Sequence, residues 1–405
     1  MALSGKRLRV AAMVTAGAIV LVGTTACGVG GDAPVTYVAA ERDQAPDEER
    51  VVTTPVGIDV PVGPAIVAGD DATFLPMTHE GRQVQPVAVL EEGFLLAETT
   101  ISEAGAAEQR FVTWSPDEGE RELAWEAEPG RQDIVAGVDG EQVVYVRAGL
   151  ELPFADWKLQ VRDLATGETE TLGAGTPEVL TAMGTEAAPP FGVAPRPAVE
   201  DGKVAWAEYE VVAGRAMRRV RVHDLATGST RLVASADGGA GEDVESPTLG
   251  GERAAWVRWA PDGTAKIEVV ELDTGKWEQL DISANPYAIA LDAEGTTLAW
   301  DDAHGGKYAL SLESGVPVRF AGDEGWGITV SGRRFAWVPA AAYGGTGGYY
   351  DLETRELRLL GKKPDVQVNQ ATVMGDWFVW QELVIGENGQ ADLNASGYYF
   401  LPIGR

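Results

Sequence analysis

Hydrophobic residues recur along this chain as short words that end in an aromatic residue. The words are GFLLAE at Phe94 (a weaker copy), VVY at Tyr145, VAW at Trp206, AAW at Trp256, LAW at Trp300, FAW at Trp337 and FVW at Trp380. The spacings between successive aromatics are 51, 61, 50, 44, 37 and 43 residues. Periods of this size are typical of propeller blades when the residues between the words are strand-like.

The residues around each word alternate between apolar and polar side chains, as strands do. An apolar segment and a tight turn precede the word, as in PAVEDGKVAW, where Asp-Gly supplies the positive φ that a hairpin requires. An alternating run follows the word and ends in DLATG at Gly167 and Gly228, before one more short strand. In DLATG, Asp can bond the backbone two residues on and Gly takes the left-handed position. Each unit therefore predicts four antiparallel strands, with DLATG as the turn between the third and the fourth.

Seven such units predict an all-β chain folded as a seven-bladed β-propeller. The repeat resembles those of TolB-type and WD-like propeller proteins, in which a small-small-aromatic strand is followed by a strand that ends in D-x-x-T-G. The resemblance covers about residues 72–405 and concerns the architecture. It implies protein–protein contact in the cell envelope. The tryptophans of the words are expected in the core between sheets.

The last unit stops after its third strand, with SGYYFLPIGR, so its fourth strand must come from elsewhere. Residues 71–84, DATFLPMTHEGRQV, have the strand and turn pattern to supply it. This would join the two ends of the chain and remove an open sheet edge. The alternative is that residues 71–84 and 65–68 form most of an eighth blade. We prefer seven blades.

The first 26 residues are typical of an export signal, because a basic segment precedes an apolar run and a small-residue cleavage site. The apolar run, residues 10–23, is shorter than the roughly 20 residues that a membrane-spanning helix needs. Cys27 follows, and this context resembles the lipobox of bacterial lipoproteins, which implies a lipid on Cys27. Thr24 stands where Leu is usual, and ordinary secretion is the alternative.

Residues 27–64 are rich in Gly, Pro, Asp and Glu and are expected to form a flexible tether, although the apolar pieces 35–39 and 51–56 are compatible with strands. The propeller is then expected over residues 65–405. Cys27 is the only cysteine, so neither a disulfide nor a thiol nucleophile is available to the folded part.

The net charge of −30 makes the chain strongly acidic. Without residues 1–26, which hold three basic residues and no acidic one, 29 basic and 62 acidic residues remain, a formal charge of −33. Such a surface repels nucleic acid and anionic lipid head groups. We therefore expect a monomer that touches the membrane only through the lipid on Cys27. Its expected place is the outer face of the bacterial cytoplasmic membrane, or the medium if the lipobox is not used.

Residues 173–197 interrupt the repeat, and they carry Met183, Phe191 and several prolines. Loops this long in a compact repeat are usually functional or disordered. In the following unit, Arg215, Arg218 and Arg219 lie close together in the sequence. We predict that Met183, Phe191 and these arginines bind an anionic partner. The alternative is a cationic hairpin that neighbouring acids neutralise.

Two acidic segments are candidates for cation binding. Asp301, Asp302 and His304 combine residue types that hold metals, although they lack a recognised ligand spacing, and a solvated loop is the alternative. Asp243 and Glu245 lie in the acidic loop 237–246 and could together hold a calcium ion, with a solvated connection as the alternative. No other cofactor is expected. His79 is expected in a turn and His223 on the surface beside the DLATG turn.

No catalytic residue is predicted, because neither G-x-S-x-G nor a phosphate-binding G-x-x-x-x-G-K-[ST] occurs. An enzyme whose acid and base come from different blades stays open. The sequence thus predicts an exported, lipid-anchored propeller that binds or scaffolds an envelope protein or peptide. The alternatives are an extracytoplasmic hydrolase or lyase and a sensor for a small ligand or cation, both using the central channel.

Overall fold

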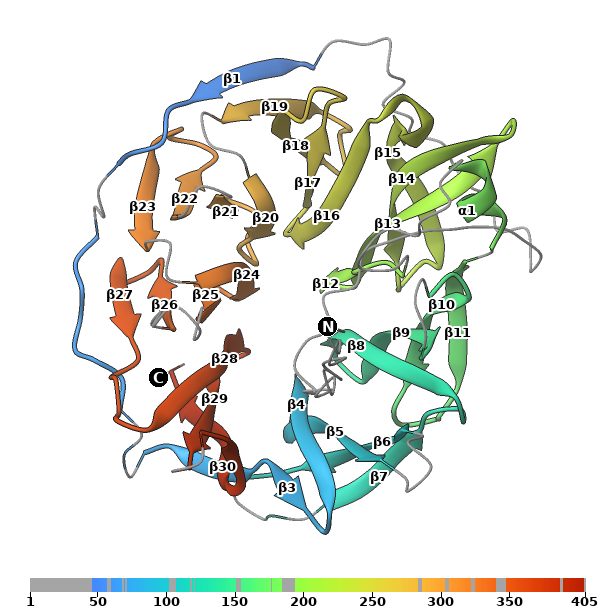
Figure 1. The fold of residues 1–405 in the computed structure, drawn as a ribbon. Coiled ribbons are helices and arrows are strands. Elements are labelled where there is room, and N and C mark those ends of the chain that lie inside the picture. Colours follow the sequence, from blue (N-terminus) through green and yellow to red (C-terminus); the bar gives the residue numbers. More distant parts are fainter. Residues whose placement is uncertain are drawn as a thin grey trace, which may run out of the picture.

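Seven β-sheets stand side by side around a common centre, as the blades of a propeller (Figure 1). The computed structural model describes residues 46–403, except for residues 57–59, 68, 70, 102–106, 117, 118, 120, 151–153, 176, 184–193, 283–285, 303–305, 322–324, 340–346, 387 and 388. The prediction of an all-β chain with seven four-stranded blades is confirmed, and the eight-bladed alternative is wrong. Among the described residues, no helix has the length and apolar character needed to cross a bilayer.

Six blades use four consecutive strands, ordered along the chain from the centre outwards. Blade 1 contains β4 (Arg82–Leu90), β5 (Gly93–Ile101), β6 (Ala107–Trp114) and β7 (Arg121–Glu126). Blade 2 contains β8 (Arg131–Asp139), β9 (Gln142–Gly149), β10 (Trp157–Asp163) and β11 (Thr169–Ala174). Blade 3 contains β12 (Ala198–Glu200), β13 (Lys203–Val212), β14 (Arg215–Asp224) and β15 (Ser229–Asp237). Blade 4 contains β16 (Asp243–Gly250), β17 (Arg253–Trp259), β18 (Ala265–Glu271) and β19 (Trp277–Ile282). Blade 5 contains β20 (Pro286–Leu291), β21 (Thr297–Asp302), β22 (Lys307–Ser311) and β23 (Pro317–Ala321). Blade 6 contains β24 (Gly325–Ser331), β25 (Arg334–Pro339), β26 (Gly348–Asp351) and β27 (Glu356–Leu359).

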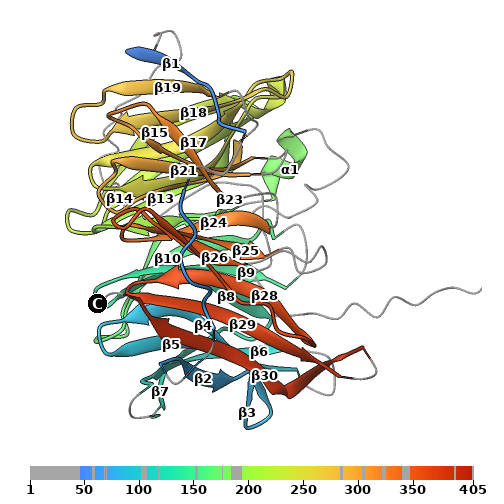
Figure 2. The same ribbon diagram turned by 90° about the vertical axis from the view of Figure 1, so that its left-hand side faces the viewer.

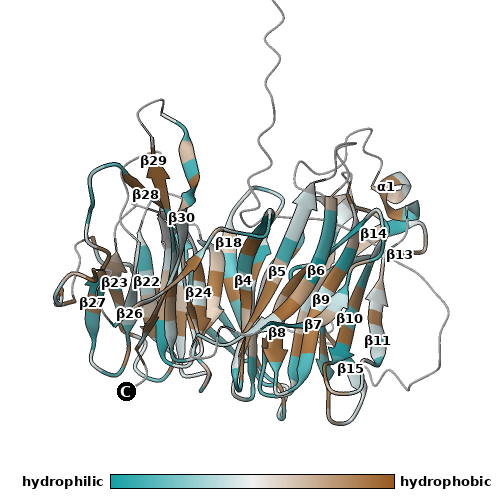
Figure 3. Cartoon of the chain, turned by 90° about the horizontal axis from the view of Figure 1, so that it is seen from below, coloured by the Kyte–Doolittle hydropathy of each residue, from teal (hydrophilic) through white to brown (hydrophobic). Residues whose placement is uncertain are grey.

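The aromatic residue of every word lies on the second strand of its blade and is buried. Trp206, for example, packs with Trp157 and Leu159 of the preceding blade. Buried and more exposed residues alternate along strands such as β14, and Figure 3 shows brown and teal segments within single strands. The word-bearing second strands are instead buried on both faces, as β9 is from Val143 to Val146. The prediction that the words form the core is confirmed.

The two DLATG segments form the predicted turns between the third and fourth strands of blades 2 and 3. Asp163 accepts a hydrogen bond from the backbone N–H of Thr166 at 2.7 Å, and Asp224 accepts one from Thr227 at 2.8 Å. These bonds reach three residues along the chain rather than the two expected, and they lower the pKa of both carboxyl groups. Gly228 has the expected positive φ, +66°.

Blade 7 is closed by the N-terminal part of the chain, as predicted. It contains β28 (Val366–Met374), β29 (Trp377–Ile385) and β30 (Ala391–Pro402), and β2 (Thr73–Pro76) pairs antiparallel with β30 as its outer strand. Leu75 of β2 is buried among residues of blades 7 and 1. The chain then passes through β3 (Thr78–His79), which carries His79 beside the expected turn, into blade 1.

Residues 46–56 and 60–67, here called the strap, run along the outer edges of blades 4, 5 and 6 (Figures 1 and 2). Within the strap, β1 (Glu48–Val52) pairs in parallel with β19 as a fifth strand of blade 4. Further along, the N–H of Ile66 donates to the carbonyl of Leu359 in blade 6 at 2.7 Å. The described part of the expected tether thus lies against the propeller, and residues 27–45 lie outside the described residues.

The strap pairs with two of the three outer strands whose ladders are regular, the third being β2 of blade 7. In blades 1, 2, 3 and 5 the register shifts between the third and fourth strands. In blade 4 the register between these strands is unbroken, from Ile267 opposite Leu280 to Val270 opposite Trp277. In blade 6 it is also unbroken, from Gly348 opposite Leu359 to Asp351 opposite Glu356. Bulges blunt a sheet edge, and regular edges invite another strand. The chain covers those two regular edges with its own backbone.

We predict that Leu75→Ala lowers the free energy of unfolding by about 2–5 kcal/mol, because it empties a buried position in the closing strand. The urea midpoint of the mature chain measures this. The control is Val316→Ala at an exposed position, with an expected change within about 0.5 kcal/mol. Equal effects of the two substitutions would contradict closure of the ring by β2.

Candidate functional site

Each blade holds a carboxylate and a cationic side chain in contact. The pairs are Glu98 with Arg110 and Arg121, Asp133 with Arg147, Glu208 with Arg221, Glu268 with Arg258, Asp301 with Lys307, Asp351 with Arg334, and Glu382 with Lys363. The seven carboxylate side chains are between 0% and 12% exposed. Burying a charge is costly unless it is paired and hydrogen-bonded, so each carboxylate depends on its cation. We call this set the blade pairs.

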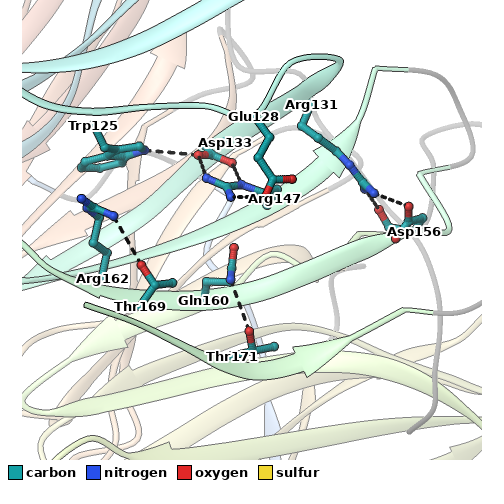
Figure 4. Close-up of polar contacts among 10 residues, drawn as sticks. All are labelled: Trp125, Glu128, Arg131, Asp133, Arg147, Asp156, Gln160, Arg162, Thr169 and Thr171. Atoms are coloured by element: carbon teal, nitrogen blue, oxygen red, sulfur yellow. Dashed lines mark hydrogen bonds and ion pairs between the residues drawn. The ribbon is translucent and has the colours of Figure 1, made fainter. Parts of the chain in front are cut away.

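The pair in blade 2 shows how these contacts join two blades (Figure 4). Asp133 accepts two hydrogen bonds from the guanidinium of Arg147, both at 2.7 Å, and one from the indole N–H of Trp125 at 3.2 Å. Trp125 belongs to blade 1, whereas Asp133 and Arg147 belong to blade 2. The bond to Asp133 raises the pKa of Arg147. Both carboxylate oxygens of Asp133 are thus engaged in holding the two sheets together.

A sequence signal for these pairs exists, although it was missed above. The second residue after the aromatic of the word is charged in five blades, and in four of them it is a member of the blade pair: Arg147, Glu208, Arg258 and Glu382. In blade 5 this position is Asp302, and the pair is formed by its neighbour Asp301. Residues two apart on a strand point to the same side, so this charge is carried between the sheets with the aromatic. The indole N–H groups of Trp206 and Trp380 donate to Glu208 and Glu382, each at 3.0 Å.

The insertion at residues 173–197 contains α1 (Glu178–Ala182), which packs on the β13–β14 hairpin of blade 3. Val179 of α1 is fully buried against Tyr209 and Ala216. Met183, a predicted partner-binding residue, is half-buried beside this contact. The structure therefore brings Met183 and the arginine-bearing hairpin together. Phe191 lies outside the described residues.

The arginines of β14 do not form one surface. Arg218 and Arg219 are neighbours on a strand and therefore point to opposite sides. Arg218 is buried over the ring of Tyr209, with its Cζ 4.4 Å from the ring centroid, whereas Arg219 pairs with Glu210. Arg215 is 65% exposed and pairs with Asp237 at 2.7 Å. These contacts fit the alternative interpretation, a cationic hairpin that neighbouring acids neutralise. Partner binding by the arginines stays a prediction.

A buried polar network links blades 3 and 4 beneath this hairpin. The hydroxyl of Tyr209 donates to Asp243 at 3.2 Å, and Nε of Arg218 lies 3.6 Å from the same carboxylate. Burial raises the pKa of Tyr209 to about 12, and burial followed by the charge of Asp243 raises the pKa of Glu245. Asp243, a calcium candidate, thus has two protein partners. Calcium binding by Asp243 and Glu245 stays a prediction.

The metal candidates of blade 5 are also engaged by the protein. Asp301 accepts hydrogen bonds from Nζ of Lys307 and from the backbone N–H of Gly327, both at 2.7 Å. Asp302 is buried beside it, and His304 lies outside the described residues. Within the described part of the chain, no group of three His, Cys, Asp or Glu residues is suited to a metal ion. A metal site that includes His304 stays a prediction.

The remaining sequence-based expectations concern Cys27 and His223. Cys27 lies outside the described residues, so its lipidation stays a prediction. His223 was expected on the surface, and this is wrong, because its ring is buried and its Nδ1 lies 2.9 Å from Oγ1 of Thr230. Burial lowers the pKa of His223. The alternation of β14 turns this side chain toward the sheet interface rather than toward the solvent.

Comparison with known proteins identifies the fold. No family profile and no curated protein matches the chain. The β-propeller domain of the Trilobed protease from Pyrococcus furiosus is similar, with 10% identity, a TM-score of 0.52, and coverage of 80% of this chain and 94% of that one. U3-55K matches with 14% identity, a TM-score of 0.47, and coverage of 84% of this chain and 100% of that one. An acylaminoacyl peptidase from Pyrococcus horikoshii matches with 10% identity, a TM-score of 0.49, and coverage of 75% of this chain and 49% of that one. At these identities the likeness shows the fold alone: the chain is a β-propeller protein.

We predict that the Asp133–Arg147 pair is strongly coupled. Asp133→Ala removes both hydrogen bonds that the buried carboxylate accepts from Arg147 and, among the described residues, leaves Arg147 paired only with the exposed Glu128, 3.0 Å away. We expect it to cost about 3 kcal/mol of unfolding free energy. The double variant with Arg147→Met is expected to cost less than the sum of the single variants by about 1–3 kcal/mol, measured by urea unfolding.

The exposed pair of Arg215 and Asp237 is the matched control for this cycle. Its coupling is expected below about 1 kcal/mol, because Arg215 is 65% exposed and solvent screens its charge. Additive effects at Asp133 and Arg147 would contradict the role given to the blade pairs.

Proposed function

We propose that this protein is an exported, lipid-anchored propeller of TolB-type, WD-like repeats that binds or scaffolds a partner protein or peptide at the bacterial cell envelope. The export signal and the lipobox-like context of Cys27 support this location. The formal charge that remains without residues 1–26 argues against nucleic acid and anionic lipid as partners. The rigid ring provides a platform on which loops can present binding residues.

The observation that carries this proposal is the seating of α1 on blade 3. The insertion is the largest departure from the repeat, and its first part is held in place by the buried side chain of Val179. Figure 3 shows α1 and the outer ends of β28, β29 and β30 directed toward the same face of the disc. A loop that is anchored on a rigid scaffold suits recognition, because less conformational entropy is lost on binding. Met183 lies at this anchored part and is the residue best placed to touch a partner.

The enzymatic alternative, a hydrolase or lyase, has one observation in its favour. Burial raises the pKa of Glu245, which lies beside Asp243, and a carboxyl group with a raised pKa can act as a general acid. Against this, the seven carboxylates of the blade pairs are each engaged by an Arg or Lys. A sensor for a small ligand or cation would draw on the same Asp243 and Glu245. We therefore place partner binding first.

We predict that a photo-crosslinking amino acid at position 183 captures one envelope protein in cells that produce the lipidated chain. The same amino acid at position 316 is the control, because Val316 is exposed on the outer turn of blade 5, away from the insertion. The readout is a covalent adduct on a denaturing gel, identified by mass spectrometry. No adduct from position 183, or the same adduct from both positions, would argue against binding at the insertion.

We predict that Cys27→Ala moves the protein from the membrane fraction to the soluble or secreted fraction, because the change removes the site of the lipid. Cell fractionation followed by immunoblotting measures this. Thr25→Ala, which keeps a small residue two positions before the cysteine, is the control and should leave the protein in the membrane. A Cys27→Ala protein that stays in the membrane would rule out the proposed anchor.

A further inference from the structure

The strap is held on blade 4 by a set of complementary charges. Asp47 exchanges two hydrogen bonds with the backbone of Trp277, its N–H donating to the carbonyl at 3.0 Å and its carboxylate accepting from the N–H at 2.9 Å. Glu49 accepts a hydrogen bond from Nζ of Lys266 at 2.8 Å, and Glu48 lies 3.9 Å from Nζ of Lys276. Two successive acidic residues thus meet two lysines, and the next residue, Arg50, pairs with Glu278 of the same edge at 2.6 Å. In a chain this acidic, the two lysines favour a segment with acidic residues at the positions of Glu48 and Glu49.

The apolar contribution of β1 is small. Val52 is its one buried side chain, and it packs with Ile282 of blade 4 and Leu312 of blade 5. Val51 is 75% exposed, and Val56 just beyond the strand is 88% exposed. Besides the backbone pairing along five residues and the single buried valine, Arg50 pairs with Glu278 and donates to the carbonyl of Leu312. These contacts are few beside those within the blades, so this end of the strap can open locally while the blades stay folded.

The edge beneath β1 has the geometry for strand addition. The ladder between β18 and β19 is unbroken, and β1 continues it from Glu48 opposite Glu278 to Val52 opposite Ile282. An extended peptide that adds to such an edge gains backbone hydrogen bonds, and alternate side chains confer specificity. In blades 1, 2, 3 and 5 the outer register is shifted, which disfavours the same reaction there.

We propose that the outer edge of blade 4 is a strand-acceptor site for an extended acidic segment of a partner protein, and that residues 47–52 occupy it as an exchangeable plug. The segment that fits has acidic residues opposite Lys266 and Lys276 and a branched apolar residue in the place of Val52. Strap and partner compete for one edge, so partner binding requires release of β1. This inference does not depend on partner binding by the insertion at residues 173–197, and the two are tested by different experiments.

The test uses the full mature chain and a fluorescent peptide that copies residues 45–54, APDEERVVTT. Val52→Asp places a charge at the one buried position of β1 and opens the site, while the contacts of the strap with blade 6 and β2 remain. Fluorescence anisotropy should show saturable binding of the peptide to this variant. Wild type should bind about tenfold more weakly or not at all, because its own strap competes at high local concentration.

Charge reversal supplies the specificity control. Lys266→Glu with Lys276→Glu, added to Val52→Asp, should weaken binding of the peptide by about tenfold. A peptide with Glu48→Lys and Glu49→Lys should then bind the reversed site and not the original one. A second opened chain, Glu48→Lys with Glu49→Lys, leaves the core untouched and should also bind the wild-type peptide.

The two opened chains decide the proposal together. Circular dichroism and the urea midpoint establish that each variant is folded. Absence of peptide binding to a folded Glu48→Lys, Glu49→Lys chain, or binding that ignores the charges at positions 266 and 276, would overturn the strand-acceptor site.

Discussion

A carboxylate held against a cation beside a buried aromatic is the contact around which the ring is organised. The aromatic fills the space between two sheets, and the strand period carries a charged side chain into the same space. That charge is tolerated only with a partner, as Asp133 has in Arg147 and Trp125. A blade that shifted its register would separate such a pair and leave a buried charge. Packing thus supplies the stability of a ring without disulfides, and we infer that the pairs help to select one arrangement of it.

The departures from this repeating plan coincide with the surfaces that we assign to function. The strap pairs with the regular outer strands of blades 4 and 6, whereas bulges already discourage strand addition at the outer edges of blades 1, 2 and 3. The insertion does not extend a sheet but wraps the hairpin of blade 3 with α1. We place recognition where the repeat is broken, because binding residues are concentrated on segments that a rigid scaffold positions.

Local patterns made the blades predictable from the sequence. The aromatic words and the DLATG turns depend on residues a few positions apart, and the closing strand followed from a missing fourth strand in blade 7. The pairing of β1 with β19 was not predictable, because its partners lie about 230 residues apart and its single buried valine leaves a weak periodicity. The arginines of β14 illustrate the opposite case: nearness in sequence suggested one patch, whereas strand alternation places Arg218 and Arg219 on opposite sides. The blade pairs join side chains of different strands. The periodicity of the sequence shows which strand positions are charged, but not which acid contacts which base.

Native-state hydrogen exchange on the mature chain, followed by mass spectrometry of peptic fragments, is the most direct test of this account. Fragments that contain the second and third strands of the blades should exchange together, with protection that approaches the global free energy of unfolding. Fragments from residues 46–56 should exchange at lower free energy, because Val52 is the one buried side chain of β1. Strap fragments protected to the global limit, or blade fragments that exchange one blade at a time at very different free energies, would contradict a cooperative ring carrying one detachable strap.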